Sequence, residues 1–153
     1  ELNSLSKSFN MAGWRIGMLS GKAEVLKEAL KVKSNIDSGM FYGVQQGAIA
    51  ALKMRPNWFS QLNEVYKKRK ALMVVFAEKL GASIEPGRVG LFLWAKLPEG
   101  STDAETFIDS ILREKNIFIT PGTIFGSQGN GYVRFSLCVS EAKIIKAIKR
   151  LES

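Results

Sequence analysis

The sequence predicts an α/β protein in two parts, residues 1–56 and residues 57–153. Apolar residues recur at helical spacing in several segments, and short apolar runs typical of strands lie between the later segments. A long helical pattern begins at residue 57 and opens the second part, in which strands and helices alternate. The first part offers one strand and two helices, so it has no complete sheet of its own.

The first part contains the single predicted strand, WRIGMLS (14–20), whose alternation indicates a buried strand after a loop. Residues 23–33 carry an apolar face with lysines on the other side, which predicts a helix. The segment 35–43 is rich in Asn, Asp, Ser and Gly and predicts a loop. The Ala-rich residues 44–54 predict a short helix.

A long helix is predicted from Asn57 to about Leu80, because an apolar stripe runs along this whole segment. It is longer than the usual helix of a globular domain, and helices of this kind often join two bodies. Gly81 follows the last apolar position and is placed to end the helix.

The rest of the second part alternates between strands and helices. Strands are predicted at 89–97, 116–120 and 132–139, with a Gly-rich loop at 121–131. A capping box at 102–105 predicts a helix through about residue 114. Ser140 is predicted to cap a last helix with an apolar face.

The cysteine and histidine contents exclude several kinds of site. The chain has one cysteine and no histidine, which excludes a disulfide framework, histidine-based triads and most zinc sites, so no metal is expected. The lone Cys138 lies in the apolar run GYVRFSLCV and is predicted to be a buried thiol. With no signal peptide recognised, it indicates a cytoplasmic protein. No apolar run approaches the length of a membrane span, so no membrane partner is expected.

The net charge of +8 raises the question of nucleic-acid binding. The densest basic cluster, residues 67–70, lies inside a helical pattern and is interpreted as a solvated helix face. No aromatic stacking platform or helix-turn-helix pattern accompanies it, so no nucleic-acid partner is expected. The chain begins with Glu, close to a chemical motif, which favours the C-terminal part of a longer protein.

That motif is SLSKSFNMAGWRIG, residues 4–17. Taken alone, a lysine in a serine-rich loop such as Lys7 is a solvated side chain. Here its small neighbours leave space around the amine, and Arg15 stands between two glycines. Hydroxyls and an arginine fork suit a phosphate group, and a lysine amine is the group that forms Schiff bases.

SLSKSFNMAGWRIG resembles the pyridoxal 5′-phosphate (PLP) attachment segment of the class I/II aminotransferases, the fold type I family. PGTIFGSQGNGYVRFSL, residues 121–137, is similar to the Pro-Gly…Arg-hydrophobic-Ser segment near the C-terminus of this family. The resemblance covers the whole chain. It implies a C-terminal remnant of the large PLP-binding domain at 1–56. Residues 57–153 would be the interdomain helix and a small α/β domain with a small, mainly antiparallel sheet.

The resemblance also implies roles for individual residues. Lys7 would carry PLP as a Schiff base and move a proton between the substrate Cα and the cofactor. Ser4 and Arg15 would hold the cofactor phosphate, with Ser6 a weaker candidate. Arg134 would bind the substrate α-carboxylate in a bidentate manner; taken alone, it is a strand arginine in a surface ion pair.

Two further features match the family less specifically. Residues 35–43 match a region that reaches the neighbouring active site in the dimeric family, and a plain interhelix loop is the alternative. A homodimer is therefore expected. Phe92 matches a substrate-side aromatic in some members, but packing in the core is the favoured interpretation.

The activity implied is transfer of an amino group between an amino acid and a 2-oxo acid by ping-pong kinetics. The family groups that bind the pyridine nitrogen, the ring hydroxyl and the ring face lie upstream of the lysine. None of them is in this chain, so it is expected to be inactive alone. Three alternatives stay open: a β-lyase of the same fold, an aminotransferase-like regulator that binds DNA, and a degenerate relative. The amino donor stays open among aspartate, diaminopimelate, aromatic and other amino acids.

Overall fold

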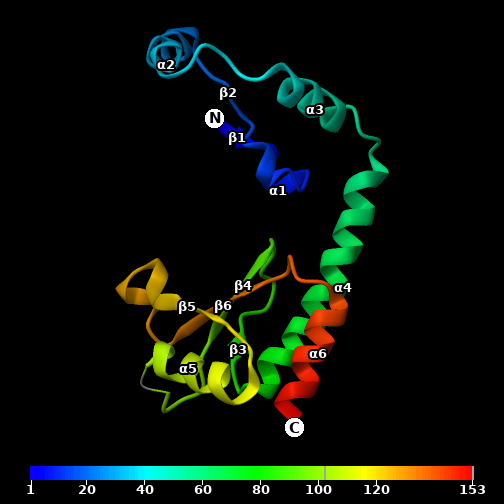
Figure 1. The fold of residues 1–153 in the computed structure, drawn as a ribbon, viewed down its shortest axis with the longest axis vertical. Helices are drawn as coiled ribbons and strands as arrows, with labels where there is room; N and C mark the ends of the chain where they lie inside the picture. Colours follow the sequence, from blue (N-terminus) through cyan, green and yellow to red (C-terminus); the bar gives the residue numbers. More distant parts are fainter. Residues whose placement is uncertain (102, 153) are drawn as a thin grey trace. The chain divides into compact units, whose positions relative to one another are not determined.

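The structure is a computed structural model that describes residues 1–101 and 103–152. It divides into two compact units, Glu1–Ser60 and Gln61–Ser153 (Figure 1). Helices and small antiparallel sheets make up these units, so the predicted α/β class is confirmed. The predicted domain boundary between residues 56 and 57 stays a prediction.

The elements of the first unit are short, apart from two of its helices. In chain order they are β1 (Leu2–Ser4), α1 (Leu5–Ser8), the 3-10 helix η1 (Ala12–Trp14), β2 (Gly17–Leu19), α2 (Ala23–Ile36) and α3 (Tyr42–Leu52). The long helix α4 (Asn57–Lys79) begins in this unit.

The sheet of the first unit pairs β1 with β2 in antiparallel register, so that Ser4 lies opposite Gly17. A Cβ atom on Gly17 would lie 2.7 Å from the carbonyl oxygen of Asn3, so this pairing requires a glycine. The prediction of a buried strand over 14–20 is wrong in length and burial. Arg15 takes a left-handed conformation that delays the strand to Gly17, and all the residues of β2 are exposed.

The helices of the first unit differ in burial. No residue of α2 is buried, and the helix runs to Ile36, beyond the predicted end at residue 33. In α3, Ala48 and Ala51 are buried, and the Trp14 ring lies against Gly47 so closely that a Cβ there would meet it at 2.2 Å. The loop predicted over 35–43 is reduced to the segment 37–41.

The second unit contains a sheet with strand order β3-β4-β6-β5, in which every neighbouring pair is antiparallel. Its elements after α4 are β3 (Ser83–Ile84), β4 (Phe92–Lys96), α5 (Ala104–Lys115), β5 (Thr120–Pro121), η2 (Gly122–Phe125), η3 (Ser127–Gly129), β6 (Tyr132–Ser136) and α6 (Glu141–Glu152).

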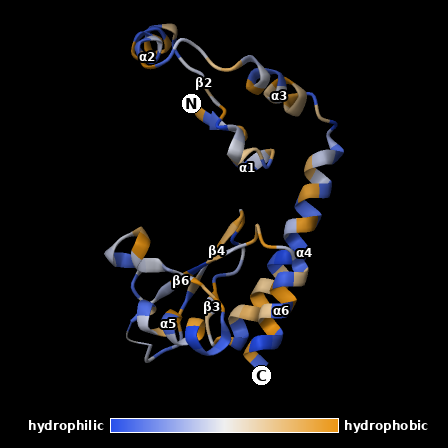
Figure 2. Ribbon diagram, viewed as in Figure 1, coloured by the Kyte–Doolittle hydropathy of each residue, from blue (hydrophilic) through white to orange (hydrophobic). Residues whose placement is uncertain are grey.

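The pleat of β4 and β6 divides their side chains between two faces. Leu93, Ala95 and Val133 are fully buried, and with Phe135 they form the sheet side of the core. Helices α4, α5 and α6 and the segments next to the strands supply the rest of the core. The ring of Phe76 packs edge-on against that of Phe135, with centroids 5.6 Å apart. Figure 2 shows apolar residues on β4, α4 and α6. The intervening residues of β4 and β6 point to the other face.

Helices α4 and α6 lie side by side and run in the same direction (Figure 1). Arg69 contacts Glu141 at 2.9 Å near the start of α6, and Lys79 contacts Glu152 at 2.7 Å near its end. Arg69 also donates a hydrogen bond to the Leu137 carbonyl, at 3.1 Å. Its side chain is only 19% exposed, so the interpretation of residues 67–70 as a solvated face is wrong for this arginine.

The end of α4 is confirmed as predicted. Gly81 has a φ of +70°, and its N–H donates to the carbonyl of Glu78. The N–H of Ala82 donates to the carbonyl of Ala77, which completes a Schellman motif. A residue with a side chain would be strained at this φ.

The predicted strands of the second unit are shorter than expected. Asn116 ends α5 in a left-handed conformation, so the strand predicted over 116–120 pairs only at Thr120 and Pro121. Strand β6 ends at Ser136, after which the chain turns. Cys138 lies within this turn and is exposed, which contradicts the predicted buried thiol.

Helix α5 begins at Asp103, whose side chain accepts a hydrogen bond from the N–H of Thr106 at 2.9 Å. The predicted capping box is therefore corrected to an Asp cap. Glu105 instead accepts a hydrogen bond from the hydroxyl of Thr123, at 2.9 Å. The Thr102 part of the box lies outside the described residues.

The last helix begins at Glu141, as the predicted cap at Ser140 requires, and the carbonyl of Ser140 accepts from the N–H groups of Lys143 and Ile144.

Among residues 1–101 and 103–152, no helix combines the length and the apolar character needed to cross a membrane.

Replacing Gly122 by Ala is expected to destabilise the protein. The new Cβ would lie 2.2 Å from the carbonyl oxygen of Gly129 and 2.8 Å from that of Tyr132. Such overpacking costs about 1–3 kcal/mol of the free energy of unfolding. Gly21→Ala is the matched control, because a Cβ there meets no atom within 4 Å. Equal denaturation midpoints for the two variants would contradict this close approach.

Stability in acid is expected to depend on Asp103. Hydrogen bonds from the N–H and then the hydroxyl of Thr106 lower the pKa of its carboxyl. Its contribution is therefore complete above the ordinary Asp pKa of about 3.9, and it is lost as the pH falls through the lower folded-state value. Asp103→Asn keeps a cap that does not titrate.

The measurement is the free energy of unfolding against pH for wild type, Asp103→Asn and the control Asp109→Asn on the same helix. The Asp103→Asn curve should fall less steeply below about pH 4 than the wild-type curve. Parallel curves for wild type and Asp103→Asn would rule out this role of the cap.

Candidate functional site

The residues that the sequence singles out lie in both units. Ser4, Ser6, Lys7 and Arg15 belong to Glu1–Ser60, and Arg134 belongs to Gln61–Ser153. Each unit is described by its own local geometry, around α1 in the first unit and on β6 in the second.

The site in the first unit is built on the short helix α1. Ser4 caps this helix, because its Oγ accepts from the N–H of Ser6 at 3.1 Å. The hydroxyl of Ser4 also lies 2.9 Å from that of Ser6, and Ser8 Oγ donates to the Ser4 carbonyl at 3.4 Å. Lys7 stands in this turn and is exposed. The structure therefore gathers hydroxyls beside the lysine.

Arg15 connects η1 to β2 and has a φ of +51° and a ψ of +46°. This left-handed conformation costs a residue with a side chain about 1–2 kcal/mol. The N–H of Leu5 donates to the carbonyl of Ile16 at 3.3 Å, which draws the start of α1 to the residue after Arg15. Strain of this kind is concentrated at functional sites in proteins.

The side chain of Arg15 is exposed, and its Nη1 donates to the carbonyl of Ala12 at 3.0 Å. The structure thus brings the hydroxyls of Ser4 and Ser6 together, and it turns the guanidinium of Arg15 back onto η1. A guanidinium has five N–H donors, so its hydrogen bond to the Ala12 carbonyl uses only one of them.

A pocket of about 210 Å³ lies beside α1. Ser4, Ser8 and Gly17 contribute to its wall, together with apolar residues of α1, β2 and α3. Neither Lys7 nor Arg15 lines it. The pocket is therefore the apolar side of the turn, and the lysine is on a different side.

The site in the second unit centres on Arg134, which lies opposite Trp94 in the register of β4 and β6. It belongs to the face of the sheet that points away from the core. The carbon Cζ of its guanidinium lies 4.4 Å from the ring centroid of Phe92 and 4.3 Å from that of Phe125. Phe92 is 36% exposed on this face, so the interpretation of Phe92 as a core residue is wrong.

Phe125 lies in the predicted Gly-rich loop 121–131 and is not among the predicted site residues. The structure places it at the end of η2, where its ring meets Trp94 edge-on at 5.8 Å. Trp94 in turn stacks on Tyr132, with centroids 5.6 Å apart and an interplanar angle of 17°. The sequence signal for this turn is an aromatic residue directly before a glycine. In the structure that glycine, Gly126, has a φ of +122°.

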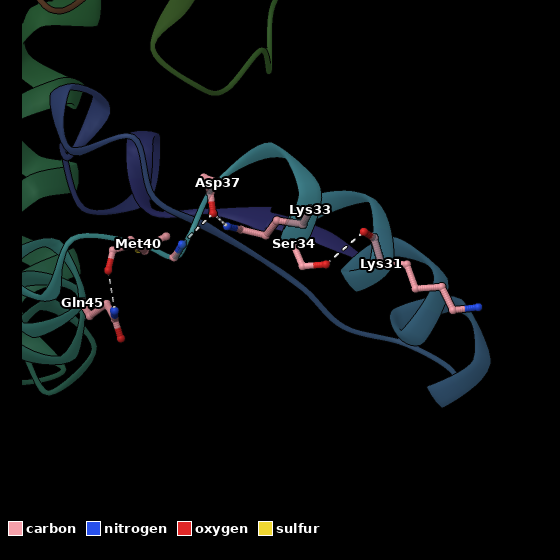
Figure 3. Close-up of polar contacts among 7 residues, drawn as sticks. Lys31, Lys33, Ser34, Asp37, Met40 and Gln45 are labelled. Carbon is pink, nitrogen blue, oxygen red and sulfur yellow. Dashed lines mark hydrogen bonds and ion pairs between the residues drawn. The ribbon is translucent and has the colours of Figure 1, made fainter.

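The segment between α2 and α3 is held by polar contacts from both helices (Figure 3). The carboxylate of Asp37 accepts hydrogen bonds from Lys33 Nζ at 2.6 Å and from the N–H of Gly39 at 3.0 Å. Both lower the pKa of Asp37, and the bond from Lys33 has the larger effect. Gln45 Nε2 donates to the carbonyl of Met40 at 2.8 Å. The segment is therefore a fixed turn.

This turn leads to two exposed aromatic side chains, Phe41 at 76% and Tyr42 at 70% exposure. Across the residues that the structure describes, no group of three or more Cys, Asp or Glu side chains is placed to hold a metal ion.

Comparisons with known proteins agree over nearly the whole chain. The family profile described as aminotransferase class I and II matches residues 1–151. The LL-diaminopimelate aminotransferase of Oleidesulfovibrio alaskensis is 39% identical over 153 residues, which are 100% of this chain and 39% of the relative. The LL-diaminopimelate aminotransferase of Aquifex aeolicus is 41% identical, with the same shares of the two chains covered.

Among solved structures, a probable N-succinyldiaminopimelate aminotransferase from Thermus thermophilus is similar with a TM-score of 0.87 and 34% identity. The similarity covers 99% of this chain and 40% of that one. The chain thus spans about two fifths of the length of the relatives that it matches. Because the family profile extends over almost every residue, the chain belongs to the class I and II family of PLP-dependent aminotransferases.

Proposed function

We propose that the whole protein that carries this chain is an aminotransferase that moves an amino group between an amino acid and a 2-oxo acid, with Lys7 as its catalytic lysine. The observation that carries this proposal is the exposed turn of α1, in which Lys7 stands among serine hydroxyls within the motif 4–17. The family membership of the chain supports it.

The donors around α1 fit the phosphate of PLP. Ser4 and Ser6 offer two neighbouring hydroxyls, and Arg15 offers an exposed guanidinium fork. Hydroxyls and guanidinium groups form strong hydrogen bonds with phosphate oxygens. We assign Ser4 and Arg15 as the main phosphate ligands and Ser6 as an additional one.

When bound, PLP supplies an electron sink for the bonds at the substrate Cα. The amine of Lys7 would hold the cofactor and, once the substrate amine has displaced it, would act as the base that moves a proton from the substrate Cα to the cofactor carbon. Exposure of Lys7 on α1 leaves room for both tasks. Arg134 binds the α-carboxylate of the substrate, for which a guanidinium offers two parallel N–H groups.

The names of the relatives support a proposal on the substrate class. Two of those described above are named for LL-diaminopimelate and one for N-succinyldiaminopimelate. We therefore propose an amino donor of the diaminopimelate class as the first substrate to assay, with aspartate and aromatic amino acids beside it. Release of ammonia and pyruvate instead of a 2-oxo acid would indicate the β-lyase alternative.

We also propose that the protein works as a homodimer, as is typical of the family. Phe41 and Tyr42 are the side chains that we assign to the dimer contact, because the fixed turn over 37–41 presents them to solvent. Large exposed aromatics are enriched at protein interfaces. A cytoplasmic location stays a prediction.

Reduction of the whole protein with borohydride is expected to fix the pyridoxyl group on Lys7. Peptide mapping by mass spectrometry locates the label, and Lys7→Ala should abolish both the label and the transfer of the amino group. Lys22→Ala, in the loop before α2, is the control and should keep both. A label on another lysine, or no label in wild type, would refute the role of Lys7.

Arg15→Gln is expected to weaken the binding of PLP. Loss of hydrogen bonds to a charged group costs about 1.5–3 kcal/mol, which is roughly 10- to 100-fold in the dissociation constant. The dissociation constant is measured by titrating cofactor-free protein with PLP. Arg55→Gln, an exposed arginine outside the motif, should bind as wild type does. Equal dissociation constants for PLP in Arg15→Gln and Arg55→Gln would contradict the assignment of Arg15 as a phosphate ligand.

A further inference from the structure

The guanidinium of Arg134 rests against two aromatic rings. Its Cζ lies 4.4 Å from the Phe92 centroid and 4.3 Å from the Phe125 centroid. Within residues 1–101 and 103–152, no carboxylate or carbonyl accepts a hydrogen bond from this side chain. The guanidinium lies over the faces of both rings at cation–π distance, which leaves its N–H groups available to an anion.

Both rings are themselves held in place. The register of the sheet sets the position of Phe92, because this residue lies two residues before Trp94 and therefore on the same face as Arg134. Phe125 is fixed by its edge-on contact with Trp94, and Trp94 is stacked on Tyr132. The four rings and the guanidinium thus form one continuous series of contacts, which we call the arginine stack.

We propose that Phe92 and Phe125 are positioning residues that set the orientation of Arg134 for carboxylate binding. This inference rests on the proposed function of Arg134 as the α-carboxylate ligand. A free arginine side chain has many rotamers, and ordering them opposes binding. A guanidinium already held by two rings has given up most of this freedom before the substrate arrives.

The rings have a second effect on binding. Their apolar bodies displace water from the π-face of the guanidinium, and hydrogen bonds strengthen where water is excluded. The N–H edge of a guanidinium matches the two oxygens of a planar carboxylate. The arginine stack therefore favours substrates with an α-carboxylate over the corresponding amines.

The test uses the whole enzyme loaded with PLP and measures the half-reaction with the amino acid substrate. Phe92→Leu and Phe125→Leu are each expected to raise KM about 3- to 30-fold, the range of a cation–π contact, with a smaller change in kcat. Phe92→Tyr and Phe125→Tyr keep the ring and should restore KM to near the wild-type value. Phe118→Leu is the matched control, because Phe118 is 68% exposed and lies outside the stack.

Two further measurements separate positioning from a general loss of structure. The half-reaction with the matching amine, which lacks the α-carboxylate, should be equally slow in wild type and in the Leu variants. In an Arg134→Lys background, the Leu substitutions should raise KM no further. A rise in KM for the amine, or an undiminished rise in the Arg134→Lys background, would overturn the proposal.

The failure of this inference is distinguishable from that of the proposed function. If Arg134→Lys raises KM and the Leu variants do not, then Arg134 binds the carboxylate without help from the rings, and only the inference fails. If Arg134→Lys itself leaves KM unchanged, the assignment of Arg134 fails and the inference fails with it. Borohydride labelling of Lys7 tests the aminotransferase proposal independently of both.

Discussion

The pairing of β4 with β6 is the constraint on which the second unit depends. Its register sends Leu93 and Val133 into the core and leaves Phe92 and Arg134 on the opposite face. A shift of one residue in this pairing would exchange the two faces, burying a guanidinium and exposing the core. Burial of the apolar face against α4, α5 and α6 therefore fixes the location of Arg134 as firmly as any contact of its own.

The first unit reaches its local geometry through close approach of the backbone. Gly17 has no room for a Cβ beside β1, and the resulting contact brings the chain after Arg15 to the start of α1. Ser4 then serves both strand and helix, since it ends β1 and caps α1. The grouping of hydroxyls around Lys7 is in this sense a product of the hairpin.

Helices were predictable from the sequence because their apolar period and their ends are local signals. The end of α4 at Gly81 and the start of α6 after Ser140 were predicted from neighbouring residues alone. The strands were predicted too long, because pairing depends on a distant partner. Thr120 pairs with Arg134 of β6, whereas Ile117 and Ile119 pack their side chains in or against the core without joining the sheet. Cys138 was misjudged for the same reason, since β6 stops before it.

The candidate site was predictable only in part. A contiguous motif and a family resemblance singled out the residues around Lys7 and Arg134. The contact between Arg134 and Phe125 was not visible, because it joins a loop to a strand through a turn whose shape is set by glycines. The positive φ of Arg15 was not predictable from the neighbouring residues either, because it belongs to the connection into β2, which pairs with β1.

That positive φ has a consequence for how this position tolerates change over evolution. Glycine would fit the backbone at residue 15 with less strain than arginine, by about 1 kcal/mol. Selection for stability alone would thus drift toward glycine at this position. Under the proposed role of Arg15 in phosphate binding, an arginine at this position is a compromise between folding and chemistry, and a screen for thermal resistance would recover variants that lose its charge.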